Sequence, residues 1–420
     1  MYNRALRGLY PPGSTMKPFY ALAGLEYGVI DYGHRLFCPG YYKLPNVDHK
    51  YRDWKKWGHG MVDMNEAITE SCDVYFYDLA MALGIDKMSG FMHKFGFGEK
   101  SGIDLVGEVD GLMPSKEWKR RYRNQVWFPG ETVITGIGQG YTQVTPLQLA
   151  RATATLANYG KVVNPHLVQE IITPDYAAPP ELRIVPDIPL KPANVDNILR
   201  SMTNVVHSPR GTAKLIAKNI NYQIAGKTGT AQVFTVKQEE KYNEDAVDFK
   251  MRDHALFIAL APVHDPQIAV AVIAEHGGHG GSVAAPIAAE IIDAYLNQTK
   301  ELRHETRNAQ RTISNAVAAW QPAAQIAYRY SAIHRFVDDF GTEFRDLVQR
   351  RRPGSGNAGT PCQPCRVGDR LDDGIGAHQS APVSDFFRRF VFGVRVVADR
   401  RCSNRSDQHG CPALAGFGFF

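Results

Sequence analysis

Long hydrophobic runs are missing from this sequence. The longest apolar stretches, HALFIALAPV and IAVAVIAE, fall well short of the roughly 20 residues that a membrane-spanning helix requires. The N-terminal segment MYNRALRGLYPPG also lacks the apolar stretch of a signal peptide. We therefore expect any export signal or membrane anchor to lie upstream of this chain.

Cysteine is scarce as well, with six in 420 residues. Such a count excludes a small scaffold held together by disulfides. Four of the six lie in the last part of the chain: Cys362, Cys365, Cys402 and Cys411. A zinc ribbon is one interpretation of these four, but eight residues separate the second pair, where a ribbon has two to four.

An excess of positive charge is absent from most of the chain. The 17 Arg and 12 acidic residues of 301–420 account for the whole net charge of +5, so residues 1–300 are neutral. No basic stripe favours a nucleic-acid partner. Lysine also disappears after Lys300, while Arg, Gly and Pro accumulate. This shift predicts a domain over residues 1–298 and a disordered or out-of-frame tail over residues 299–420.

Helix-like and strand-like patterns alternate over the predicted domain. Helical periodicity marks residues 18–28, 65–84 and 144–160. Strand-like runs cover residues 222–234, 254–263 and 267–275, and a final amphipathic helix covers residues 284–297. In the helix at 144–160, Thr145 is the expected N-cap and Gln148 completes a capping box. We expect an antiparallel meander with helices packed against it, which is an α+β fold.

The segment PPGSTMKPF places Ser14 and Lys17 three residues apart at the start of a predicted helix. At 3.6 residues per turn, this spacing brings both side chains to one face. Ser14 also lies at the positive end of the helix dipole. A serine becomes a nucleophile when a base lies within hydrogen-bond reach, and a neutral lysine can be that base. The alternative is a helix-capping serine followed by a solvated lysine.

The segment AGKTGTAQ lies within a strand-like run. Strand alternation places Lys227 and Gly229 on one face, where a cation stands beside a position without a side chain and a substrate could lie along the strand. Thr230 adds a hydroxyl for a substrate carboxylate. A phosphate-binding P-loop is excluded. That motif needs a glycine five residues before Gly226, and this sequence has Asn221 there.

The segment ESCDVYFY, residues 70–77, puts Ser71, Cys72 and Asp73 in a row. If the backbone near Ser71 is extended or turning, the side chains of Ser71 and Asp73 point one way and that of Cys72 points the other. The same strip would then serve two sites.

These motifs occur in the order S-x-x-K, S-x-[N/D], K-T-G, the set found in penicillin-binding proteins and serine β-lactamases. Each is weak alone, but the ordered set is a strong signal. The sequence resembles the penicillin-binding protein 2 family of elongation-specific peptidoglycan transpeptidases over roughly residues 2–297, also in NRALRGLYPPGSTMKPF, YRDWKKWGHG, GIGQGYTQVTPLQLA and AGKTGTAQVF.

The resemblance implies a transpeptidase fold like that of serine β-lactamases, with helices on both faces of an antiparallel sheet plus an all-helical subdomain. The family has a pedestal domain and a membrane anchor upstream, so we expect this chain to be truncated at its N-terminus. The resemblance does not extend into the predicted tail.

The resemblance also implies a two-step acyl transfer. Ser14 would attack the D-Ala-D-Ala carbonyl of a stem peptide, and Lys17 would take its proton. Ser71 would relay a proton to the leaving D-alanine, and Asp73, where many relatives have Asn, would orient Ser71 and Lys17. An amine of a neighbouring stem peptide would then resolve the acyl-enzyme. β-Lactams would acylate Ser14 as mimics of the donor.

Substrate binding is implied for the lysine-threonine-glycine strand. Lys227 would keep the site positive, and Thr228, Gly229 and Thr230 would bind the substrate, with the two threonines at its carboxylate. The backbone N–H groups of Ser14 and Thr230 would meet the developing oxyanion. Two alternatives stay open: a β-lactamase or carboxypeptidase that passes the acyl group to water, and a noncatalytic β-lactam sensor or scaffold.

Partners and location are implied by the same resemblance. The substrates would be peptidoglycan stem peptides, and β-lactam antibiotics would bind as inhibitors. A membrane glycan polymerase and other proteins of the elongation complex would be partners, at the periplasmic face of the bacterial inner membrane. Catalysis itself would require no cofactor.

Cys38, Asp53, His59 and Cys72 are all of zinc-ligand types, and four protein ligands would make a closed, structural site. Some members of the family hold zinc at matching positions, which favours structural zinc here. A disulfide between Cys38 and Cys72 is the second interpretation, since the family works in the oxidising periplasm. Two free buried thiols are the third. The histidine-rich segment HGGHGG at 276–281 is better explained as a glycine loop.

Overall fold

The structure is a computed structural model of the 420-residue chain, and it describes residues 2–173, 176–178, 183–232, 252–299 and 390–391. The predicted tail lies outside the described residues, except for residue 299 and strand β10 (Phe390–Val391). Its four cysteines, and the zinc ribbon considered for them, lie outside as well.

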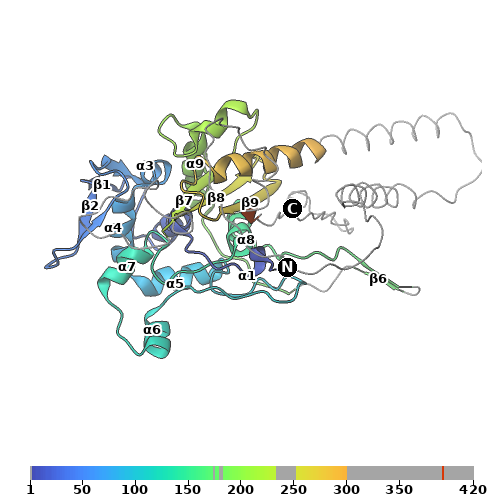
Figure 1. Cartoon of the computed structure of the whole chain (residues 1–420), viewed down its shortest axis with the longest axis horizontal. Helices are drawn as coiled ribbons and strands as arrows, with labels where there is room; N and C mark the ends of the chain where they lie inside the picture. Colours follow the sequence, from blue (N-terminus) through green and yellow to red (C-terminus); the bar gives the residue numbers. More distant parts are fainter. Residues whose placement is uncertain (1, 174–175, 179–182, 233–251, 300–389, 392–420) are drawn as a thin grey trace, which may run out of the picture. The chain divides into compact units, whose positions relative to one another are not determined.

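The central sheet contains β7 (Ala225–Ala231), β8 (His254–Ala261), β9 (Ile268–Ala274) and β10 (Figure 1). The strand order is β10-β9-β8-β7, and all neighbours are antiparallel. The three strands predicted from the sequence form the expected meander, and β10 adds an edge strand that was not predicted. Every residue of β9 is buried, so both faces of the sheet are covered there.

Helices cover this sheet. α8 (Pro146–Ala157) contacts β8 and β9, α9 (Pro192–His207) contacts β7, and residues 284–299 form the predicted final helix. α8 begins at the predicted capping box: Thr145 Oγ1 accepts from the Gln148 N–H at 3.2 Å, and Gln148 Oε1 accepts from the Thr145 N–H at 2.9 Å. The predicted α+β architecture is confirmed.

A cluster of helices lies beside the sheet. α4 (Asp73–Leu83) contacts α2 (Lys17–Glu26), α5 (Ile85–Lys94) and α7 (Pro129–Thr135), and α2 also contacts α9. α2 therefore joins the helical cluster to the helix that covers β7. This cluster corresponds to the helical part that the resemblance implied.

The segment 65–84, predicted as one helix, forms two. α3 (Met64–Thr69) ends before Ser71, whose φ of 59° is left-handed and interrupts the helix, and α4 starts two residues later. Asp63 caps α3 through a capping box with Glu66, with hydrogen bonds of 2.8 and 3.1 Å. Helical periodicity continues across the break because α3 and α4 both bury an apolar face, so periodicity alone does not reveal the turn.

The remaining described elements are short: α1 (Arg4–Arg7), η1 (Gly13–Met16), β1 (Arg35–Cys38), β2 (Tyr41–Lys43), β3 (Lys50–Arg52), β4 (Gly60–Asp63), α6 (Lys116–Arg123), β5 (Ile171–Thr173), β6 (Tyr176–Ala178) and η2 (Lys214–Asn219). β1 pairs with β4, β2 with β3 and β5 with β6, each as an antiparallel pair.

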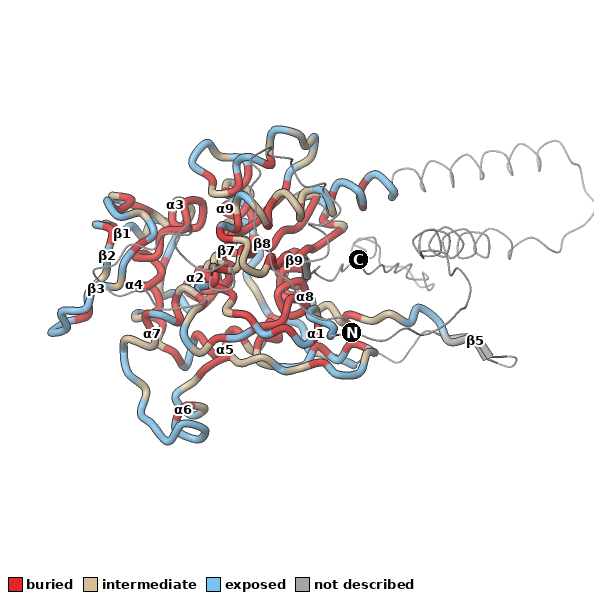
Figure 2. The backbone as a smooth tube through the Cα atoms, viewed as in Figure 1, coloured by how far each residue is buried: buried red, intermediate tan, exposed pale blue. Residues whose placement is uncertain are grey.

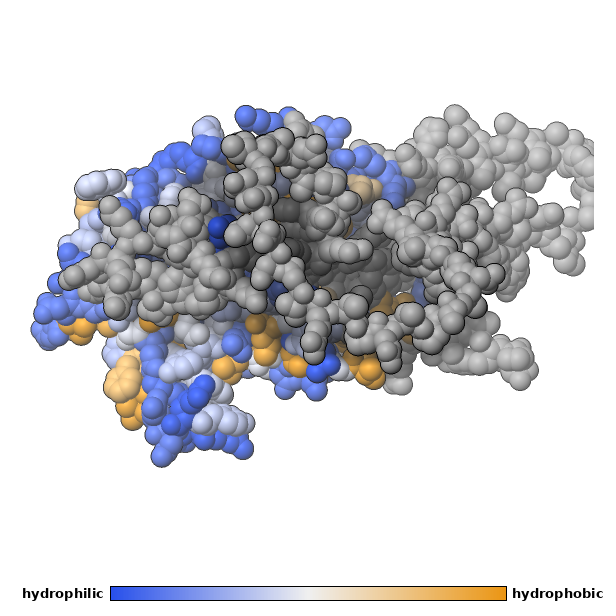
Figure 3. All heavy atoms as spheres, viewed as in Figure 1, coloured by the Kyte–Doolittle hydropathy of each residue, from blue (hydrophilic) through white to orange (hydrophobic). Residues whose placement is uncertain are grey.

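Buried residues are concentrated in the sheet and in the helices packed around it, drawn red in Figure 2. Where the atoms in Figure 3 are coloured, hydrophilic side chains predominate and hydrophobic ones occur in small groups. No helix among the described residues combines the length and the hydropathy needed to cross a bilayer.

Candidate active site

Ser14 lies on η1, the turn that leads into α2, and is half-buried. Gly13 before it has a φ of 54°, a left-handed conformation that glycine adopts without strain. A Cβ on Gly13 would lie 2.6 Å from the Thr230 carbonyl oxygen. The turn that carries Ser14 therefore lies directly against β7, as close as a residue without a side chain allows.

Lys17 begins α2, and its side chain is fully buried. Its Nζ donates to the Ser71 carbonyl oxygen at 2.9 Å and to Ser71 Oγ at 3.2 Å, and it pairs with Asp73 Oδ1 at 2.6 Å. The S-x-x-K and S-x-D motifs thus share one hydrogen-bond network. No hydrogen bond to the Ser14 hydroxyl is found among the described residues, so the network reaches Ser71 and Asp73 but not the expected nucleophile.

Asp73 starts α4, and both of its carboxylate oxygens are used. Oδ1 pairs with Lys17, and Oδ2 accepts from the backbone N–H of Trp54 at 3.1 Å. Burial raises the pKa of Asp73, and the positive charge of Lys17 opposes this rise. Trp54 also donates its indole N–H to the Glu70 carbonyl oxygen at 3.0 Å, which holds its ring beside the Ser71 turn.

Lys227 on β7 is fully buried, and its Nζ donates to the Thr228 carbonyl oxygen at 3.1 Å. Burial holds the pKa of Lys227 well below its usual value, the positive charge of Lys17 lowers it further, and Asp73 opposes the shift. β7 contacts η1, and Lys17 bonds Ser71 and Asp73, so the three motifs meet at one place.

The interpretation of Gly229 as open space for a substrate is wrong. A Cβ at Gly229 would lie 2.8 Å from Thr15 Cγ2 and 3.1 Å from the Pro12 carbonyl oxygen, so η1 fills this face of β7. Thr228 and Thr230 lie on the opposite face of the strand. Strand alternation predicts which side chains share a face, but it does not tell which face another element covers.

The HGGHGG segment forms the predicted glycine loop between β9 and the helix at 284–299. A Cβ on Gly280 would collide with the backbone oxygens of Leu256 and Gly229, so this loop packs directly on the backbone of β7 and β8. Within the described part of the chain, its histidines belong to no group of side chains that could hold a metal.

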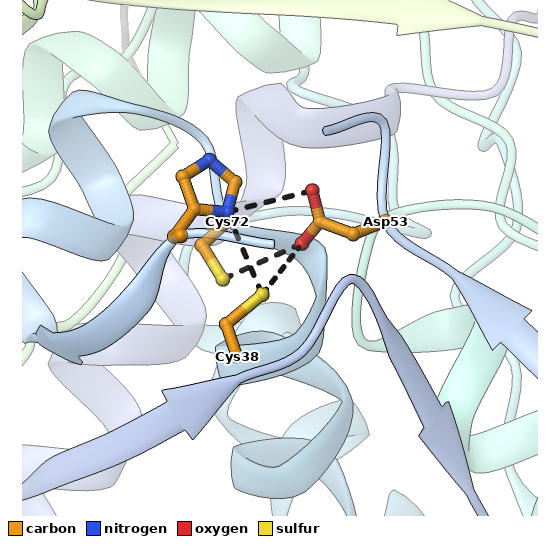
Figure 4. Close-up of side chains that lie close together, drawn as sticks. Cys38, Asp53 and Cys72 are labelled. Carbon is orange, nitrogen blue, oxygen red and sulfur yellow. Dashed lines mark hydrogen bonds and ion pairs between the residues drawn. The ribbon is translucent and has the colours of Figure 1, made fainter. Parts of the chain in front are cut away.

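Cys38, Asp53, His59 and Cys72 come together on one side of the Ser71 turn, and Figure 4 labels Cys38, Asp53 and Cys72. Cys38 Sγ lies 3.6 Å from both Asp53 Oδ2 and His59 Nδ1. Cys72 Sγ lies 3.4 Å from Asp53 Oδ2. Donors at their usual bond lengths from a tetrahedral zinc are about 3.3–3.8 Å apart, so this donor set fits the ion. Both thiols are free, which disagrees with the disulfide interpretation.

The candidate metal-ligand cluster, formed by Cys38, Asp53, His59 and Cys72, is connected to the Ser71 turn through Asp53. Its Oδ2 accepts from the backbone N–H groups of Asp73 at 2.8 Å and of Val74 at 3.1 Å, at the N-terminus of α4. A carboxylate at this end of a helix is stabilised by the helix dipole. Cys72 lies between Ser71 and Asp73, so the strip ESCDVYFY supplies residues both to the candidate metal cluster and to the Lys17 network.

The metal-free cluster contains both ionised and protonated groups, and hydrogen bonding with Cys38 together with burial raises the pKa of Cys72. Hydrogen bonding with Cys72 lowers the pKa of Cys38 to about 5 despite burial. Burial would raise the pKa of Asp53, but hydrogen bonds with His59 and with a backbone N–H hold it below its usual value. Burial would lower the pKa of His59, yet its contacts with Asp53 and Cys38 raise it to about 9. The metal-free cluster thus keeps protons on Cys72 and His59 that a metal ion would displace.

Three residues at the site were not singled out from the sequence. Trp54 contacts Asp73, the Gln139 side chain donates to the Thr230 carbonyl oxygen at 3.4 Å, and Thr212 Oγ1 lies 2.7 Å from Thr228 Oγ1. Trp54 and Gln139 lie in segments that resemble the family, YRDWKKWGHG and GIGQGYTQVTPLQLA. Thr212 had no signal in the sequence, because only the fold brings it to β7.

Comparison with known protein families agrees with this geometry. The sequence profile of the penicillin-binding protein transpeptidase domain matches residues 1–293, which contain all three motifs and the metal-ligand cluster. The chain belongs to this transpeptidase family. The family and the transpeptidase fold implied by the sequence are confirmed.

Curated relatives of this transpeptidase domain are named as peptidoglycan D,D-transpeptidases. The peptidoglycan D,D-transpeptidase MrdA of Acinetobacter baumannii is 47% identical over 305 residues, and MrdA of Haemophilus influenzae is 46% identical over 302 residues. The matches cover 72% and 71% of this chain, but 44% and 46% of the two relatives. The chain therefore spans a little under half the length of these proteins.

Solved structures are similar to the transpeptidase domain too. Pseudomonas aeruginosa PBP2 in complex with WCK 5153 is 52% identical with a TM-score of 0.63, over 70% of this chain and 60% of that chain. Helicobacter pylori PBP2 in complex with MreC is 32% identical with a TM-score of 0.59, over 70% of this chain and 51% of that chain.

Proposed function

We propose that this chain is the catalytic domain of a peptidoglycan D,D-transpeptidase that cross-links stem peptides through a serine acyl-enzyme during cell-wall elongation. The observation that carries the proposal is the network of buried Lys17 with Ser71 and Asp73, beside the turn that bears Ser14. The domain family and the MrdA relatives support the same reaction class.

The first half-reaction forms the acyl-enzyme. Lys17 first passes its proton to Asp73, whose pKa burial raises, and Ser14 Oγ then attacks the carbonyl carbon of the D-Ala-D-Ala bond while Lys17 takes the serine proton. The 3.2 Å contact from Lys17 Nζ to Ser71 Oγ supplies the route by which a proton reaches the nitrogen of the leaving D-alanine. The C–N bond breaks, D-alanine leaves as a neutral amine, and Ser14 holds the acyl group as an ester.

Charge is stabilised from the β7 side of the site. The backbone N–H groups of Ser14 and Thr230 would donate to the oxyanion, and the contact between Gly13 and Thr230 supports this pairing of η1 with β7. Lys227 would keep the potential positive, and the hydroxyls of Thr228 and Thr230 would donate to the substrate carboxylate. In the second half-reaction, an amine of a neighbouring stem peptide attacks the ester and releases Ser14.

The test is labelling with a fluorescent penicillin. The parent chain should form a covalent adduct on Ser14, and Ser14→Ala should abolish it, because the acyl-enzyme needs the hydroxyl oxygen. Ser282→Ala is the matched control, since Ser282 is exposed and its hydroxyl bonds only the His279 carbonyl oxygen among the described residues. Full labelling of Ser14→Ala would show that another residue is the nucleophile.

The lifetime of the acyl-enzyme separates the transpeptidase from two other functions. A long-lived adduct supports the transpeptidase, whereas rapid hydrolysis would indicate a β-lactamase or a carboxypeptidase. A noncatalytic sensor or scaffold would support growth of the cell with Ser14 removed. The deep burial of Lys17 and Lys227 in one site favours an enzyme, since strongly perturbed ionisable groups cluster at active sites.

A structural zinc ion is part of the proposed function. Cys38, Asp53, His59 and Cys72 would hold it, and the fit of the donor distances supports this assignment. The ion would cross-link the segments that carry these residues and thereby fix the N-terminus of α4, where Asp73 lies. No catalytic step of the proposed reaction passes through the metal.

Partners and location are proposed from the relatives. The Helicobacter pylori relative was solved with MreC, and a relative that is 28% identical belongs to a peptidoglycan synthase complex that coordinates polymerisation and cross-linking. By analogy, this domain would work with a membrane glycan polymerase and elongation proteins on the periplasmic face of the inner membrane. β-Lactams would inhibit it, as mimics of the donor peptide.

A further inference from the structure

The segment after α9, residues 208–213, bridges two of the catalytic motifs. It is a compact turn, in which the Gly211 N–H donates to the Ser208 carbonyl oxygen at 2.9 Å. Arg210 pairs with Glu66 and Glu70 of the α3 end. Glu70 directly precedes Ser71, so this turn is tied to the S-x-D motif by charge.

Thr212 connects this turn to the lysine-threonine-glycine motif of β7. Its backbone N–H donates to the Thr69 carbonyl oxygen at 3.4 Å, and its Oγ1 lies 2.7 Å from Thr228 Oγ1. A Cβ on Gly281 would collide with the Thr212 carbonyl oxygen, so the glycine loop packs against the same residue. Three separate segments therefore hold Thr212 in place beside β7.

Building on the proposed function, we propose that Thr212 is a positioning residue, whose hydroxyl aligns the Thr228 hydroxyl to donate to the carboxylate of the substrate. A hydroxyl has one hydrogen to donate and two lone pairs to accept with. Thr228 can donate to a carboxylate only while its hydrogen is not directed at Thr212. When Thr212 donates to Thr228, the single Thr228 hydrogen is directed to the ligand.

The ligand class follows from this chain of donors. A carboxylate only accepts hydrogen bonds, and its negative charge makes each of them stronger. The hydrogen bond from Thr212 polarises the Thr228 hydroxyl, which strengthens its own hydrogen bond to the carboxylate further. Thr212 should therefore matter for ligands with a free carboxylate next to the bond that Ser14 attacks. Donor stem peptides that end in D-alanine and penicillins both have this group, and a penicillin ester lacks the charge.

The experiment compares the rates at which Ser14 is acylated by benzylpenicillin and by its methyl ester, using the full chain. Thr212→Val keeps the shape of threonine and removes the hydroxyl. It should slow acylation by benzylpenicillin about tenfold and leave the ester rate within about twofold, which is the loss expected for one charge-assisted hydrogen bond. Thr212→Ser, which restores the hydroxyl, should recover the parent ratio of the two rates.

Thr203→Val is the matched control. Its hydroxyl bonds the Leu199 carbonyl oxygen within α9 at 2.7 Å and not a residue of β7, so its loss should leave the ratio unchanged. Equal slowing of both ligands in Thr212→Val, or a Thr212→Ser ratio like that of Thr212→Val, would overturn the positioning role. A parent chain that is not acylated on Ser14 by benzylpenicillin would instead overturn the proposed function, and the inference with it.

Discussion

Two lysines and one aspartate are buried together in the site, and their charges do not balance. Lys17 is compensated by Asp73 at 2.6 Å, whereas no carboxylate pairs with Lys227 among the described residues. Burial without a paired anion makes the protonated amine of Lys227 costly, as its lowered pKa indicates, and the carboxylate of a bound substrate would supply the missing anion. Lys227 is therefore the side chain whose charge costs most in the folded state.

Replacement of Lys227 should reveal this cost. Lys227→Met should raise the free energy of unfolding at pH 7, and the gain should shrink towards pH 10. The unfolded lysine binds its proton up to about pH 10.4, while the folded one releases it at lower pH, so the parent gains stability as pH rises through that window. Urea unfolding at several pH values measures the difference.

The same variant should lose function. Penicillin labelling should fall about 100-fold, because one preorganised charge at the site is removed. A stability difference that stays constant from pH 7 to pH 10, or a variant less stable than the parent at pH 7, would contradict the assignment.

Lys17 offers a second prediction at the level of single residues. Lys17→Met should reduce the penicillin labelling rate at least about 100-fold, because the proposed base is removed. Lys119→Met is the matched control: Lys119 is also buried and paired with a carboxylate, Glu131 at 2.5 Å, but lies outside the motifs. It should lower the free energy of unfolding by about 1–3 kcal/mol and leave the labelling rate of the folded protein within about twofold. Similar labelling losses in both variants would refute a specific role of Lys17.

The sequence predicted some residues of the site better than others. The ordered motifs placed Lys17 with Ser71 and Asp73, which share a hydrogen-bond network, whereas the hydrogen bond expected between Ser14 and Lys17 is not found among the described residues. Thr212 could not be found in this way, since its contact with Thr228 depends on how α9 packs on β7. Gly229 was misinterpreted because the covering of a strand face is a tertiary property.

Among the secondary-structure elements, the junction of α3 and α4 connects the metal-ligand cluster to the catalytic network. If zinc binds there, purified protein should contain about one equivalent, and His59→Gln should lose the metal and about 5 °C or more of thermal stability. His34→Gln is the control, because His34 is half-buried against Tyr75 and is no ligand. Less than about a tenth of an equivalent of zinc, with Cys72→Ser as stable as the parent, would exclude the site.

Gly84 links α4 to α5 and offers a second prediction for the secondary-structure elements. Its φ of 74° and ψ of 153° are a conformation open in practice to glycine only, and a Cβ there would touch nothing within 4 Å. Gly84→Ala should therefore destabilise the protein by about 1–3 kcal/mol through backbone strain alone. Gly90 inside α5 has equal space without a positive φ, so Gly90→Ala should stabilise by about 0.4–1 kcal/mol. Chemical denaturation that gives both variants the same sign would refute this explanation.

Over the whole molecule, the architecture was easier to predict than its details. The capping box of α8 and the three apolar strand runs were sufficient for an α+β meander, because their signals are local. Strand β10 was not predicted, since residues 390–391 lie in the segment interpreted as a tail. The break at Ser71 could be predicted only conditionally, because left-handed backbone at a serine has no local sequence signal.

The domain boundary predicts how the chain responds to truncation. A chain ending at residue 299 contains the motifs, the metal-ligand cluster and the described hydrophobic core, and of the described strand pairings it loses that of β10 with β9. It should keep penicillin labelling within about twofold of the full chain and unfold in one cooperative transition. Loss of labelling in the shortened chain would show that residues 300–420 are part of the working domain.

The absence of a side chain at Gly13 has an evolutionary consequence. Any larger residue would push against Thr230 and separate the two backbone amides proposed to bind the oxyanion. Antibiotic and natural donor would use the same pair of amides, so a substitution that excluded the drug would also disable cell-wall synthesis by this domain. Under drug selection, we expect resistance substitutions to spare this position.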